Sequence, residues 1–531
     1  MTALTHPRSG IERVFEHRFM QYRRSYRASI FSSFLTPVLF LAAMGVGLGS
    51  YVDGSTSPAL AGLSYLAFLA PGLLAATCMQ SAAFEAAFPI MSGLVWSRTF
   101  HAMHATPIDG RDIVLGNFAW IGARMVLVAT VFTVIIVLFG AAASPLIVLA
   151  IPAAALTGLA FAAPIMAFAA TQRTPNKFNA VFRFGITPLF LFSGTFYPVE
   201  SLPAAIQPLA WVTPLYHGVA LTRALSLGTV GGAPGLALIH LVVLLAFIAV
   251  GLWFASRTVG KTLFARMTAF PLTTGLLGSR RSLRLIERNL FVYKHGWIII
   301  LSGFFEPLFY LLSIGFGLGA LIGSIAGPGG QAIPYQLFVA PALLASSAMN
   351  GAITEATFNF FFKLNYNKTF EAILSTPLSA GDVAVGELGW ALIRGGLYAV
   401  GFMVVMVVLG LVVSPWVILA VPAALLIGFA FGAVGMAATS FMKTWQDFDL
   451  IQLVVLPLFL FSATFYPIET YPEALRVIVQ LTPLYQGVDL IRSLVVEAIS
   501  PILLFHVAYL LVMGFAGLWV VARRLDKLLL K

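Results

Sequence analysis

The stretch PLFLFSGTFYP at residues 188–198 recurs as PLFLFSATFYP at residues 457–467, and only Gly194 and Ala463 distinguish the two copies. The similarity extends outward from both copies over most of the chain. A repeat of about 265 residues is too long for a solenoid unit and indicates that a whole domain was duplicated.

Three shifts align the two halves, and the matched positions include charged residues and prolines. A shift of 270 residues pairs Glu85 with Glu355, Arg124 with Arg394, and Thr106-Pro107 with Thr376-Pro377. A shift of 269 pairs TPLYHGV (213–219) with TPLYQGV (482–488), and a shift of 266 pairs His240 with His506. A feature of one half therefore predicts its partner in the other.

The composition places the chain in a membrane, because 60% of its 531 residues are hydrophobic, 10% are charged and the mean hydropathy is +0.94. A helix needs about 20 mostly apolar residues to cross a bilayer, and each half contains six apolar stretches. In the first half they lie near residues 30–50, 62–92, 113–140, 147–170, 184–197 and 236–256. In the second half they lie near residues 297–320, 335–360, 383–410, 416–439, 453–466 and 502–522.

An even number of spans gives both halves the same orientation, so we expect a pseudo-two-fold axis along the membrane normal. The sequence predicts an all-α polytopic membrane protein with twelve transmembrane helices in two parallel six-helix repeats. We place the repeats at residues 1–265 and 283–531, joined by a cytoplasmic linker at residues 266–282.

The net charge of +11 is interpreted as an orientation signal and not as a nucleic-acid patch, because the basic residues are interleaved with the spans. They cluster at residues 8–27, 173–183, 257–294 and 523–531, which predicts that both termini and the linker face the cytoplasm. The Arg-rich start lacks the pattern of a secretory signal, so we expect the mature protein to begin near Met1. The single cysteine, Cys78, excludes an internal disulfide and is interpreted as a packing residue.

Two kinds of short helix are expected besides the spans. Residues 11–27 and 283–290 alternate apolar and arginine residues at helical spacing, which indicates amphipathic helices in the cytoplasmic interface. The short fifth span of each half is followed by a proline-punctuated apolar stretch, at residues 197–219 and 466–488. Non-helical backbone at membrane depth must be buried or line a cavity, so we predict two short re-entrant helices on the external side of each half.

The cytoplasmic connection between spans two and three reads WSRTFHAMHATPIDGRD at residues 96–112 and FKLNYNKTFEAILSTPLSAGD at residues 362–382. Each contains a short amphipathic stretch that ends in Thr-Pro, followed by an Asp suited to cap the next span. A simple turn does not need such a helix. The pattern therefore indicates a docking element for another protein.

The motifs FEAILSTPLSAGD (370–382), PLFLFSATFYPIE (457–469) and TPLYQGV (482–488), with their first-half partners, resemble one family over essentially the whole chain, twice. It comprises the permease subunits of ATP-binding-cassette (ABC) transporters of the second exporter type, especially those similar to lipo-oligosaccharide exporters of nodulating bacteria and anthracycline-drug exporters of actinomycetes. The resemblance implies a coupling helix that seats in an ATPase. The matching residues are Phe100, His101, His104, Thr106, Pro107, Phe370, Glu371, Thr376 and Pro377.

The same resemblance implies two copies of a separate ATPase subunit, which bind ATP and Mg²⁺, and a location in the plasma membrane of a bacterium. It also implies export of amphipathic, hydrophobic or lipid-linked substrates. Such permeases are usually single six-span chains that dimerise, whereas this chain supplies both halves. The first half departs from the coupling pattern, because His101 stands where the second half has Glu371, and His104 is a further difference. Equal coupling by the two halves is therefore in question.

We expect the chain to bind neither nucleotide nor metal and to contain no catalytic residue. TVGKTLF (258–264) ends like a phosphate-binding loop, but Ala255 occupies the position that requires glycine. His240 and His506 lie in the sixth spans, where no companion carboxylate or second histidine is expected nearby.

A charged side chain inside a membrane span raises the free energy of the protein, so its presence indicates an ion pair or a functional site. Glu85 with Arg124, and Glu355 with Arg394, are predicted to form an ion pair in each half, with a structural role because a paired carboxylate resists titration. Glu306 aligns with Thr36 and has no charged counterpart. It is either a functional carboxylate or a hydrogen-bonding group between helices.

The aromatic residues around the repeated stretch have two interpretations. They are either packing and interface residues or a ring that closes the external mouth where two copies meet. The set comprises Phe190, Phe192, Phe196, Tyr197, Phe459, Phe461, Phe465 and Tyr466.

We interpret the chain as the membrane component of an ATP-driven exporter, in which closure of an attached ATPase dimer acts through two coupling helices. The alternative is an ion-coupled secondary transporter, which can also have two parallel six-span halves. A secondary transporter needs an ion-coupling constellation in mid-membrane and no docking helices. A non-transporting scaffold would leave the paired re-entrant segments unexplained.

Overall fold

The computed structural model describes residues 9–54, 60, 62–172, 176–204, 206–264, 285–290, 305–328, 330–366, 368–376, 378–443 and 447–529. The chain forms two compact units, Met1–Pro271 and Leu272–Lys531. The boundary falls inside the predicted linker, residues 266–282, which lies outside the described residues.

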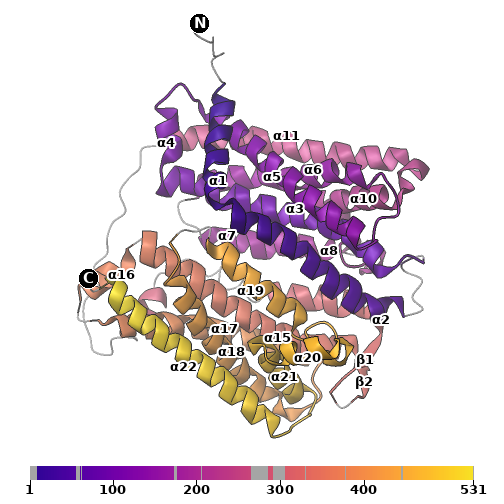
Figure 1. The fold of residues 1–531 in the computed structure, drawn as a ribbon, viewed down its shortest axis with the longest axis vertical. Coiled ribbons are helices and arrows are strands. Elements are labelled where there is room, and N and C mark those ends of the chain that lie inside the picture. Colours follow the sequence, from indigo (N-terminus) through magenta and orange to yellow (C-terminus); the bar gives the residue numbers. More distant parts are fainter. Residues whose placement is uncertain are drawn as a thin grey trace. The chain divides into compact units, whose positions relative to one another are not determined.

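The first unit is helical (Figure 1). Its long helices are α1 (Gly10–Phe40), α3 (Tyr65–Met91), α5 (Gly110–Leu138), α6 (Ile147–Thr171) and α11 (Pro234–Phe264). Its shorter elements are η1 (Leu41–Leu48), α2 (Gly49–Asp53), η3 (Ser92–Trp96), α4 (Thr99–His104), α7 (Asn176–Val181), η4 (Phe182–Ile186), α8 (Thr187–Phe192), η5 (Val199–Ser201), α9 (Gln207–Trp211), α10 (Pro214–Leu227) and η6 (Thr229–Gly232).

The second unit repeats this order of elements. Its long helices are α15 (Tyr335–Thr354), α17 (Ala380–Val408), α18 (Ala420–Thr439) and α22 (Ile502–Leu529). Its shorter helices are η7 (Leu311–Leu318), α14 (Gly319–Ile322), η8 (Glu355–Asn359), η9 (Phe362–Tyr366), α16 (Thr369–Leu374), η10 (Pro415–Leu419), α19 (Phe448–Phe461), η12 (Ile468–Thr470), α20 (Glu473–Gln480) and α21 (Pro483–Val495). A two-stranded antiparallel hairpin, β1 (Ser324–Ala326) with β2 (Ala332–Pro334), was not predicted; Ile325 lies opposite Ile333.

Ten of the described helical segments are long and apolar enough to cross a membrane. They include one segment for every predicted span except the fifth of each repeat, which is short: α7, η4 and α8 in the first unit and Leu450–Phe461 of α19 in the second. The prediction of an all-helical polytopic membrane protein is confirmed. The symmetry axis between the repeats stays a prediction.

The first span differs from its predicted form. Instead of an amphipathic helix followed by a separate span, one helix runs without a break from Gly10 to Asp53 through α1, η1 and α2. It begins with a capping box in which Ser9 and Glu12 bond each other's backbone N–H groups. The segments η1 and η7 are π-helical and follow Pro37 and Pro307, whose missing N–H groups interrupt the α-helical hydrogen-bond ladder.

Small residues bring the helices of each unit close together. In the first unit α6 packs against α3 and α11, and in the second α18 packs against α15 and α22. A Cβ atom on Gly251 of α11 would lie 2.6 Å from the Cβ atom of Ala163 in α6. At the matched position in α22, a Cβ atom on Gly517 would lie 2.7 Å from the backbone nitrogen of Val434. Close approach through small residues is a common way for membrane helices to pack.

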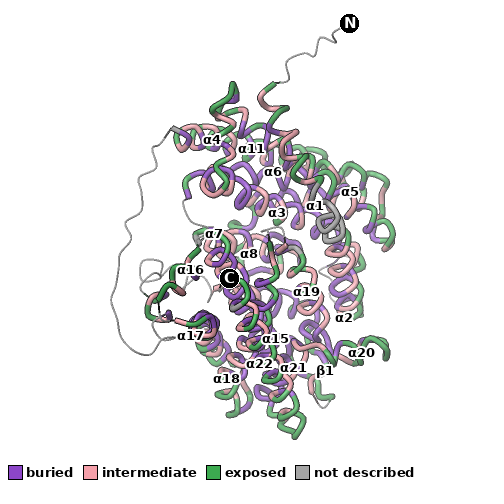
Figure 2. The backbone as a smooth tube through the Cα atoms, turned by 60° about the vertical axis from the view of Figure 1, so that its left-hand side comes forward, coloured by how far each residue is buried: buried purple, intermediate pink, exposed green. Residues whose placement is uncertain are grey.

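Burial separates an inner set of helices from an outer set. The spans formed by α3 and α15 are mostly buried, whereas only 11% of the most apolar window in Pro234–Leu263 is buried (Figure 2). The exposed residues of α11 include Leu238, Val242 and Phe254. An exposed apolar face of this length is suited to contact with lipid.

The helix crossing at Gly251 provides a test of this packing. We predict that Gly251→Ala lowers stability by about 1–3 kcal/mol, because the added methyl group overpacks a tight contact. The control is Gly260→Ala in the same helix, where a Cβ atom would meet nothing within 4 Å and where alanine favours the helix by about 1 kcal/mol. The thermal midpoints of the purified proteins should move in opposite directions. Equal shifts would contradict the packing described for α6 and α11.

Candidate functional site

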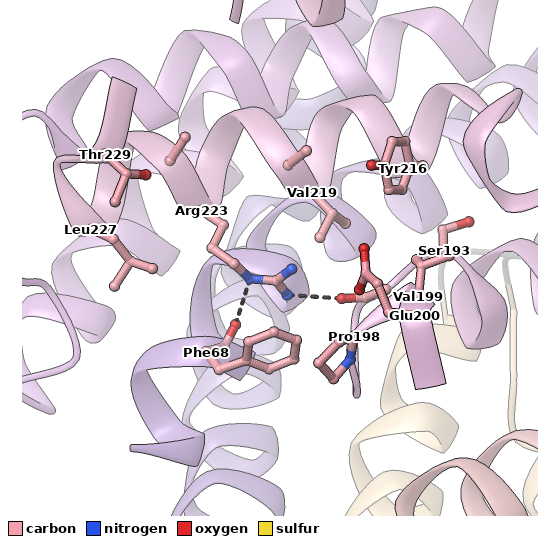
Figure 3. Close-up of a pocket in the computed structure, with 13 residues that line it drawn as sticks. Phe68, Ser193, Pro198, Val199, Glu200, Tyr216, Val219, Arg223, Leu227 and Thr229 are labelled. Carbon is pink, nitrogen blue, oxygen red and sulfur yellow. Dashed lines mark hydrogen bonds between the residues drawn. The ribbon is translucent and has the colours of Figure 1, made fainter. Parts of the chain in front are cut away.

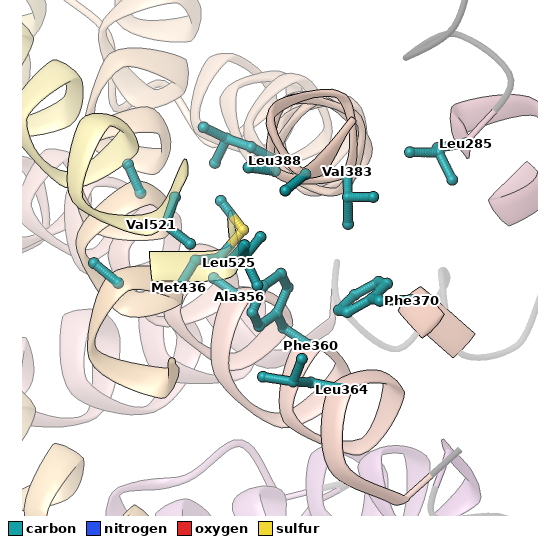
Figure 4. Packing of buried hydrophobic residues seen from close by; sticks show 14 residues of the cluster. Leu285, Ala356, Phe360, Leu364, Phe370, Val383, Leu388, Met436, Val521 and Leu525 are labelled. Atoms are coloured by element: carbon teal, nitrogen blue, oxygen red, sulfur yellow. The ribbon is translucent and has the colours of Figure 1, made fainter. Parts of the chain in front are cut away.

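The short helix α16 between spans two and three is held by one buried ring. Phe370 is 0% exposed, and its ring centroid lies 5.0 Å from that of Phe360. Both rings belong to an apolar cluster that also includes Val383 and Leu525 (Figure 4). The ring therefore fixes α16 to the ends of the second, third and sixth spans, while Glu371 remains on the outer face with its side chain 53% exposed.

The first unit contains the same arrangement. Phe100 of α4 is buried, and a Cβ atom on Gly93 would lie 2.6 Å from its ring. In both units the residue before the short helix is basic and has a left-handed backbone, with φ of 52° at Arg98 and 49° at Lys368. Such a backbone is uncommon outside glycine, and here it turns the chain sharply into each helix.

The threonines of the two Thr-Pro pairs end these short helices. The Oγ1 atom of Thr106 donates to the carbonyl oxygen of Met103 at 2.6 Å, and that of Thr376 donates to the carbonyl oxygen of Ile373 at 2.5 Å. Capping boxes at residues 109–112 and 379–382 then start α5 and α17. Pro107 is exposed, and Pro377 lies outside the described residues.

The two short helices present different chemistry. His101 is half-buried, and its Nδ1 atom has no hydrogen-bond partner among the described residues. The Nδ1 atom of His104 lies 3.3 Å from the carbonyl oxygen of Ile108. In the second unit Glu371 is exposed and pairs with Lys368, the two charged atoms being 3.6 Å apart. A partner protein would therefore meet imidazole groups on one helix and a carboxylate on the other.

The structure brings the four residues predicted to form ion pairs together. Glu85 Oε1 lies 3.6 Å from Arg124 Nη1, and Glu85 Oε2 lies 3.5 Å from Arg18 Nη2. In the second unit Glu355 pairs with Arg394, whose Nη2 atom also donates to the hydroxyl oxygen of Tyr398 at 3.1 Å. Arg18 was missed because it belongs to the amphipathic part of α1, whose path relative to the second span is not visible in the sequence.

The amphipathic segments are attached differently in the two units. In the first unit Phe15, Phe19 and Tyr22 of α1 surround Trp120, with ring centroids 5.4–6.3 Å from it. In the second unit a polar network replaces this aromatic cluster: Lys363 Nζ contacts Glu387 Oε2 at 2.5 Å and Asn289 Oδ1 at 3.3 Å. The repeat alignment pairs Phe19 with Asn289. A comparison of aligned positions would therefore have revealed that a polar residue replaces an aromatic one here.

At the opposite end of span two an arginine joins three segments of the first unit (Figure 3). Arg223 of α10 donates from Nε to the carbonyl oxygen of Phe68 at 3.1 Å and from Nη2 to that of Gly194 at 2.8 Å. Its guanidinium carbon lies 3.8 Å from the centroid of the Phe68 ring, within the range of a cation–π contact. Burial lowers the pKa of Arg223 to about 10, and the Glu200 carboxylate opposes that shift, so the side chain stays charged at neutral pH.

The second unit repeats this arrangement. Arg492 of α21 donates to the carbonyl oxygens of Phe338 at 3.3 Å and Ala463 at 2.7 Å, and it lies 3.9 Å from the Phe338 ring. We call each set, the arginine with its two carbonyl groups, the arginine clasp. In both copies of the repeated stretch the arginine binds the carbonyl oxygen of a residue with a left-handed backbone. That residue, Gly194 or Ala463, is the one position at which PLFLFSGTFYP and PLFLFSATFYP differ.

A cavity of about 260 Å³ lies beside the clasp of the first unit. Glu200, Tyr216 and Arg223 line it together with apolar residues that include Phe68 and Val219 (Figure 3). Ala220 also lines the cavity, and the residue aligned with it in the second unit is Asp489. The surroundings of the two arginines therefore differ, although their backbone contacts do not.

The predicted gate residues pack inside their own units. The rings of Phe190 and Phe196 lie edge to face with centroids 5.0 Å apart, and those of Phe459 and Phe465 do so at 5.2 Å. Tyr197 and Tyr466 are buried, whereas Phe192 and Phe461 are half-buried. These contacts support the packing interpretation, and a gate between the repeats stays a prediction.

The expected isolation of the two sixth-span histidines is wrong. His240 Nδ1 lies 2.8 Å from His217 Nδ1, and His506 contacts both Asp489 Oδ2, at 3.0 Å, and Gln486. The partners come from α10 and α21, whose packing on α11 and α22 was not predicted. Even so, the described residues contain no group of three or more His, Cys, Asp or Glu side chains that would hold a metal ion.

Comparison with known proteins agrees with this architecture. Residues 11–227 and 282–496 each match the family model described as ABC-2 type transporter. The chain is 32% identical over 219 residues to Nodulation protein J of Rhizobium leguminosarum bv. trifolii, which covers 41% of this chain and 82% of that protein. It is 33% identical over 245 residues to Nodulation protein J of Sinorhizobium fredii (strain NBRC 101917 / NGR234). That alignment covers 45% of this chain and 92% of the relative. It is 26% identical over 179 residues to the inner membrane transport permease YadH of Escherichia coli (strain K12). That alignment covers 33% of this chain and 66% of the relative.

Two long helical repeats, each with an anchored short helix at one end of span two, define a polytopic permease. The chain belongs to the ABC-2 type transporter family and contains the family's membrane domain twice. Members of this family are transporter components whose ATPase is a separate subunit, so the family implies an ABC ATPase as partner.

At the left-handed residue of the arginine clasp, substitutions should change the thermal midpoint in opposite directions in the two repeats. A residue with a Cβ atom costs about 1–2 kcal/mol in a left-handed conformation, and a Cβ atom on Gly194 would also lie 3.0 Å from Val199 Cγ2. Gly194→Ala should therefore lower the thermal midpoint of the purified protein. Ala463→Gly should raise the thermal midpoint, because it relieves the strain of a left-handed alanine. The gain in stability should be less than about 1 kcal/mol, because glycine loses more backbone entropy on folding. Shifts of the same sign would contradict this account of the loop.

Proposed function

We propose that this chain is the complete membrane-spanning component of an ATP-driven exporter, with one ABC ATPase subunit docked on α4 and a second on α16. The observation that carries the proposal is the recurrence of the anchored short helix in both repeats. Phe100 and Phe370 hold these helices rigidly, while residues on their outer faces, such as Ala102 and Glu371, stay exposed. An exposed helix on a rigid base is suited to receive force from another protein.

The contacts of each repeat provide a route for that force. The short helix α16 is joined to span two through η9 and to span three through the capping box of α17. The pair Glu355–Arg394 ties the same two spans together further along. At its other end span two is held by the arginine clasp through the carbonyl group of Phe338. A displacement of α16 would therefore move spans two and three together and reach the clasp.

The proposed cargo is an amphipathic, hydrophobic or lipid-linked molecule, such as a drug, lipid or glycolipid, moved out of the cytoplasm or the inner leaflet. The weakly charged, phenylalanine-rich composition supports such a cargo over a sugar or an ion. The distribution of Lys and Arg supports an orientation with both termini in the cytoplasm. The similarity to bacterial permeases supports a location in the plasma membrane of a bacterium.

The test is to search the neighbouring reading frames for an ABC ATPase without spans of its own, to purify the chain together with that ATPase, and to measure ATP hydrolysis with and without amphipathic substrates. We expect hydrolysis that the substrates stimulate and that requires the complete chain. Transport by the isolated chain, driven by a proton or sodium gradient alone, would instead establish the secondary transporter.

Removing the anchor of a coupling helix should uncouple the two proteins. We predict that Phe370→Ala abolishes substrate-stimulated ATP hydrolysis, because loss of a buried phenylalanine forfeits about 3–5 kcal/mol of packing and frees α16 from its base. Phe370→Leu should keep part of the stimulation. The matched control is Phe515→Ala, which removes a ring that is 61% exposed. Full stimulation in a stably folded Phe370→Ala protein would exclude α16 as the coupling element.

A further inference from the structure

Two arginines share one carboxylate inside the first unit. Arg18 of α1 and Arg124 of α5 both lie beside Glu85 of α3, with nitrogen–oxygen distances of 3.5 and 3.6 Å. The three side chains are only 11–16% exposed. Within the described part of the chain, Glu85 is the one carboxylate that pairs with either arginine. The cluster therefore holds two positive charges against one negative charge.

The hydrogen bonds of this cluster are incomplete. The Nε atoms of Arg18 and Arg124 are buried and have no hydrogen-bond partner among the described residues. The bonds that Arg18 does make are long, at 3.3 Å to Gln21 Oε1 and 3.5 Å to Glu85 Oε2. The guanidinium carbon of Arg124 lies 4.7 Å from the centroid of the Tyr22 ring, and such a cation–π contact supplies no lone pair to an N–H group. Buried donors without an acceptor destabilise a protein, so the cluster lacks an acceptor.

The second repeat supplies the acceptor that the first repeat lacks. There the aligned pair is Glu355 with Arg394, and the Nε and Nη2 atoms of Arg394 also donate to the hydroxyl oxygen of Tyr398, at 3.4 and 3.1 Å. The first repeat has Val128 at the position of Tyr398. It has thus lost an acceptor where a second arginine joins the pair, and an acceptor from outside the chain would restore the balance.

The charge of the cluster indicates which kind of group would complete it. Burial lowers the pKa of the Arg18 guanidinium group, the Glu85 carboxylate raises it, and the charge of Arg124 lowers it again. A second anion would offset the repulsion between the two arginines. Phosphate fits this role, because guanidinium groups present planar forks of N–H donors that match its oxygen atoms. Its several oxygen atoms can accept from both arginines at once.

The surroundings of the cluster indicate that the phosphate belongs to a lipid. Arg18 lies in the part of α1 that precedes the membrane-crossing segment Phe34–Asp53, whereas Arg124 lies within an apolar helix that is itself long enough to cross a membrane. Phe19, next to Arg18, and Leu127, one turn from Arg124, are both exposed. Basic pockets between membrane helices near the interface bind phospholipid head groups, and exposed apolar side chains beside such a pocket suit acyl chains.

We propose that Arg18 and Arg124 bind the phosphate group of an anionic phospholipid between α1 and α5. Glu85 neutralises one of the two positive charges, and the phosphate neutralises the other while accepting hydrogen bonds from both guanidinium groups. The acyl chains lie against exposed apolar side chains such as Phe19 and Leu127. The site belongs to the first repeat only. It is independent of the proposed export function, because it concerns a lipid that the protein holds and not a molecule that it moves.

The experiment measures lipid binding to the full chain, purified in a neutral detergent, by native mass spectrometry. The probe is dioctanoyl phosphatidic acid, and dioctanoylglycerol has the same acyl chains without the phosphate. We expect one phosphatidic acid per chain to bind at concentrations at which dioctanoylglycerol does not. Equal binding of the two lipids would overturn the phosphate site. Inorganic phosphate that displaces the lipid at equal concentration would overturn the assignment to a lipid.

A pair of aligned arginines provides the variant and its control. Arg18→Gln should weaken binding of phosphatidic acid at least about tenfold, which corresponds to about 1.4 kcal/mol. The matched control is Arg288→Gln, at the aligned position of the second repeat, where the Nη1 atom donates to Asn289 Oδ1 at 3.4 Å. This control should bind the lipid like the original chain. Unchanged binding by Arg18→Gln, or the same loss in both variants, would overturn the site.

A third variant changes binding in the opposite direction, which damage to the fold cannot imitate. Glu85→Gln removes the carboxylate that competes with the phosphate for the two arginines. We therefore expect Glu85→Gln to bind phosphatidic acid more tightly than the original chain, and its thermal midpoint to rise more when the lipid is added. Weaker binding by Glu85→Gln at an unchanged thermal midpoint would contradict the competition between the carboxylate and the phosphate.

Discussion

Backbone carbonyl groups that leave a helix within an apolar environment need hydrogen-bond donors, and this requirement shapes both repeats. The chain breaks its helix after span five, and the carbonyl groups of Gly194 and Ala463 are bound by Arg223 and Arg492. Because each arginine also binds a carbonyl group at the start of span two, one side chain holds the returning segment, span two and the loop together. The other end of span two, with its short helix, is then positioned relative to this fixed end.

The two repeats keep this constraint and differ elsewhere. The contact between the amphipathic segment and span three is aromatic in the first unit, around Trp120. In the second unit it is polar, because Asn289 donates to Glu387, and Lys363 at the end of span two contacts both residues. The short helices α4 and α16 carry His101 in one repeat and Glu371 in the other. Fusion of the repeats into one chain permits such divergence, because each surface needs to match only its own partner. A chain that paired with an identical copy would have to change both sides at once.

Much of this architecture follows from the sequence, because helical spans and a long internal repeat leave strong patterns. The ion pair of Glu355 with Arg394 follows from antiparallel neighbours joined by a short connection. Arg18 and the pairing of His217 with His240 do not, since they depend on how helices far apart in the chain pack. The clasp was also missed: Arg223 and Arg492 are matched in the alignment, but a sequence does not show which carbonyl groups lack donors. The short fifth spans and their proline-rich continuations were predicted, whereas the hairpin of β1 with β2 was not.

The central claim is that both repeats cross the membrane in the same direction, with the coupling helices inside the cell and the arginine clasps toward the outside. Because Cys78 is buried and is the only cysteine, Cys78→Ala gives a background for labelling single cysteines with a membrane-impermeant maleimide on intact cells. Cysteines placed at the exposed residues Thr229 and Ser500, beyond α10 and α21, should be labelled in intact cells. Cysteines at Ala105 and Ser375, at the ends of the coupling helices, should react only after the cells are permeabilised. Labelling of Thr229→Cys together with Ser375→Cys, and of neither of the other two, would show that the repeats are inverted and would contradict the account.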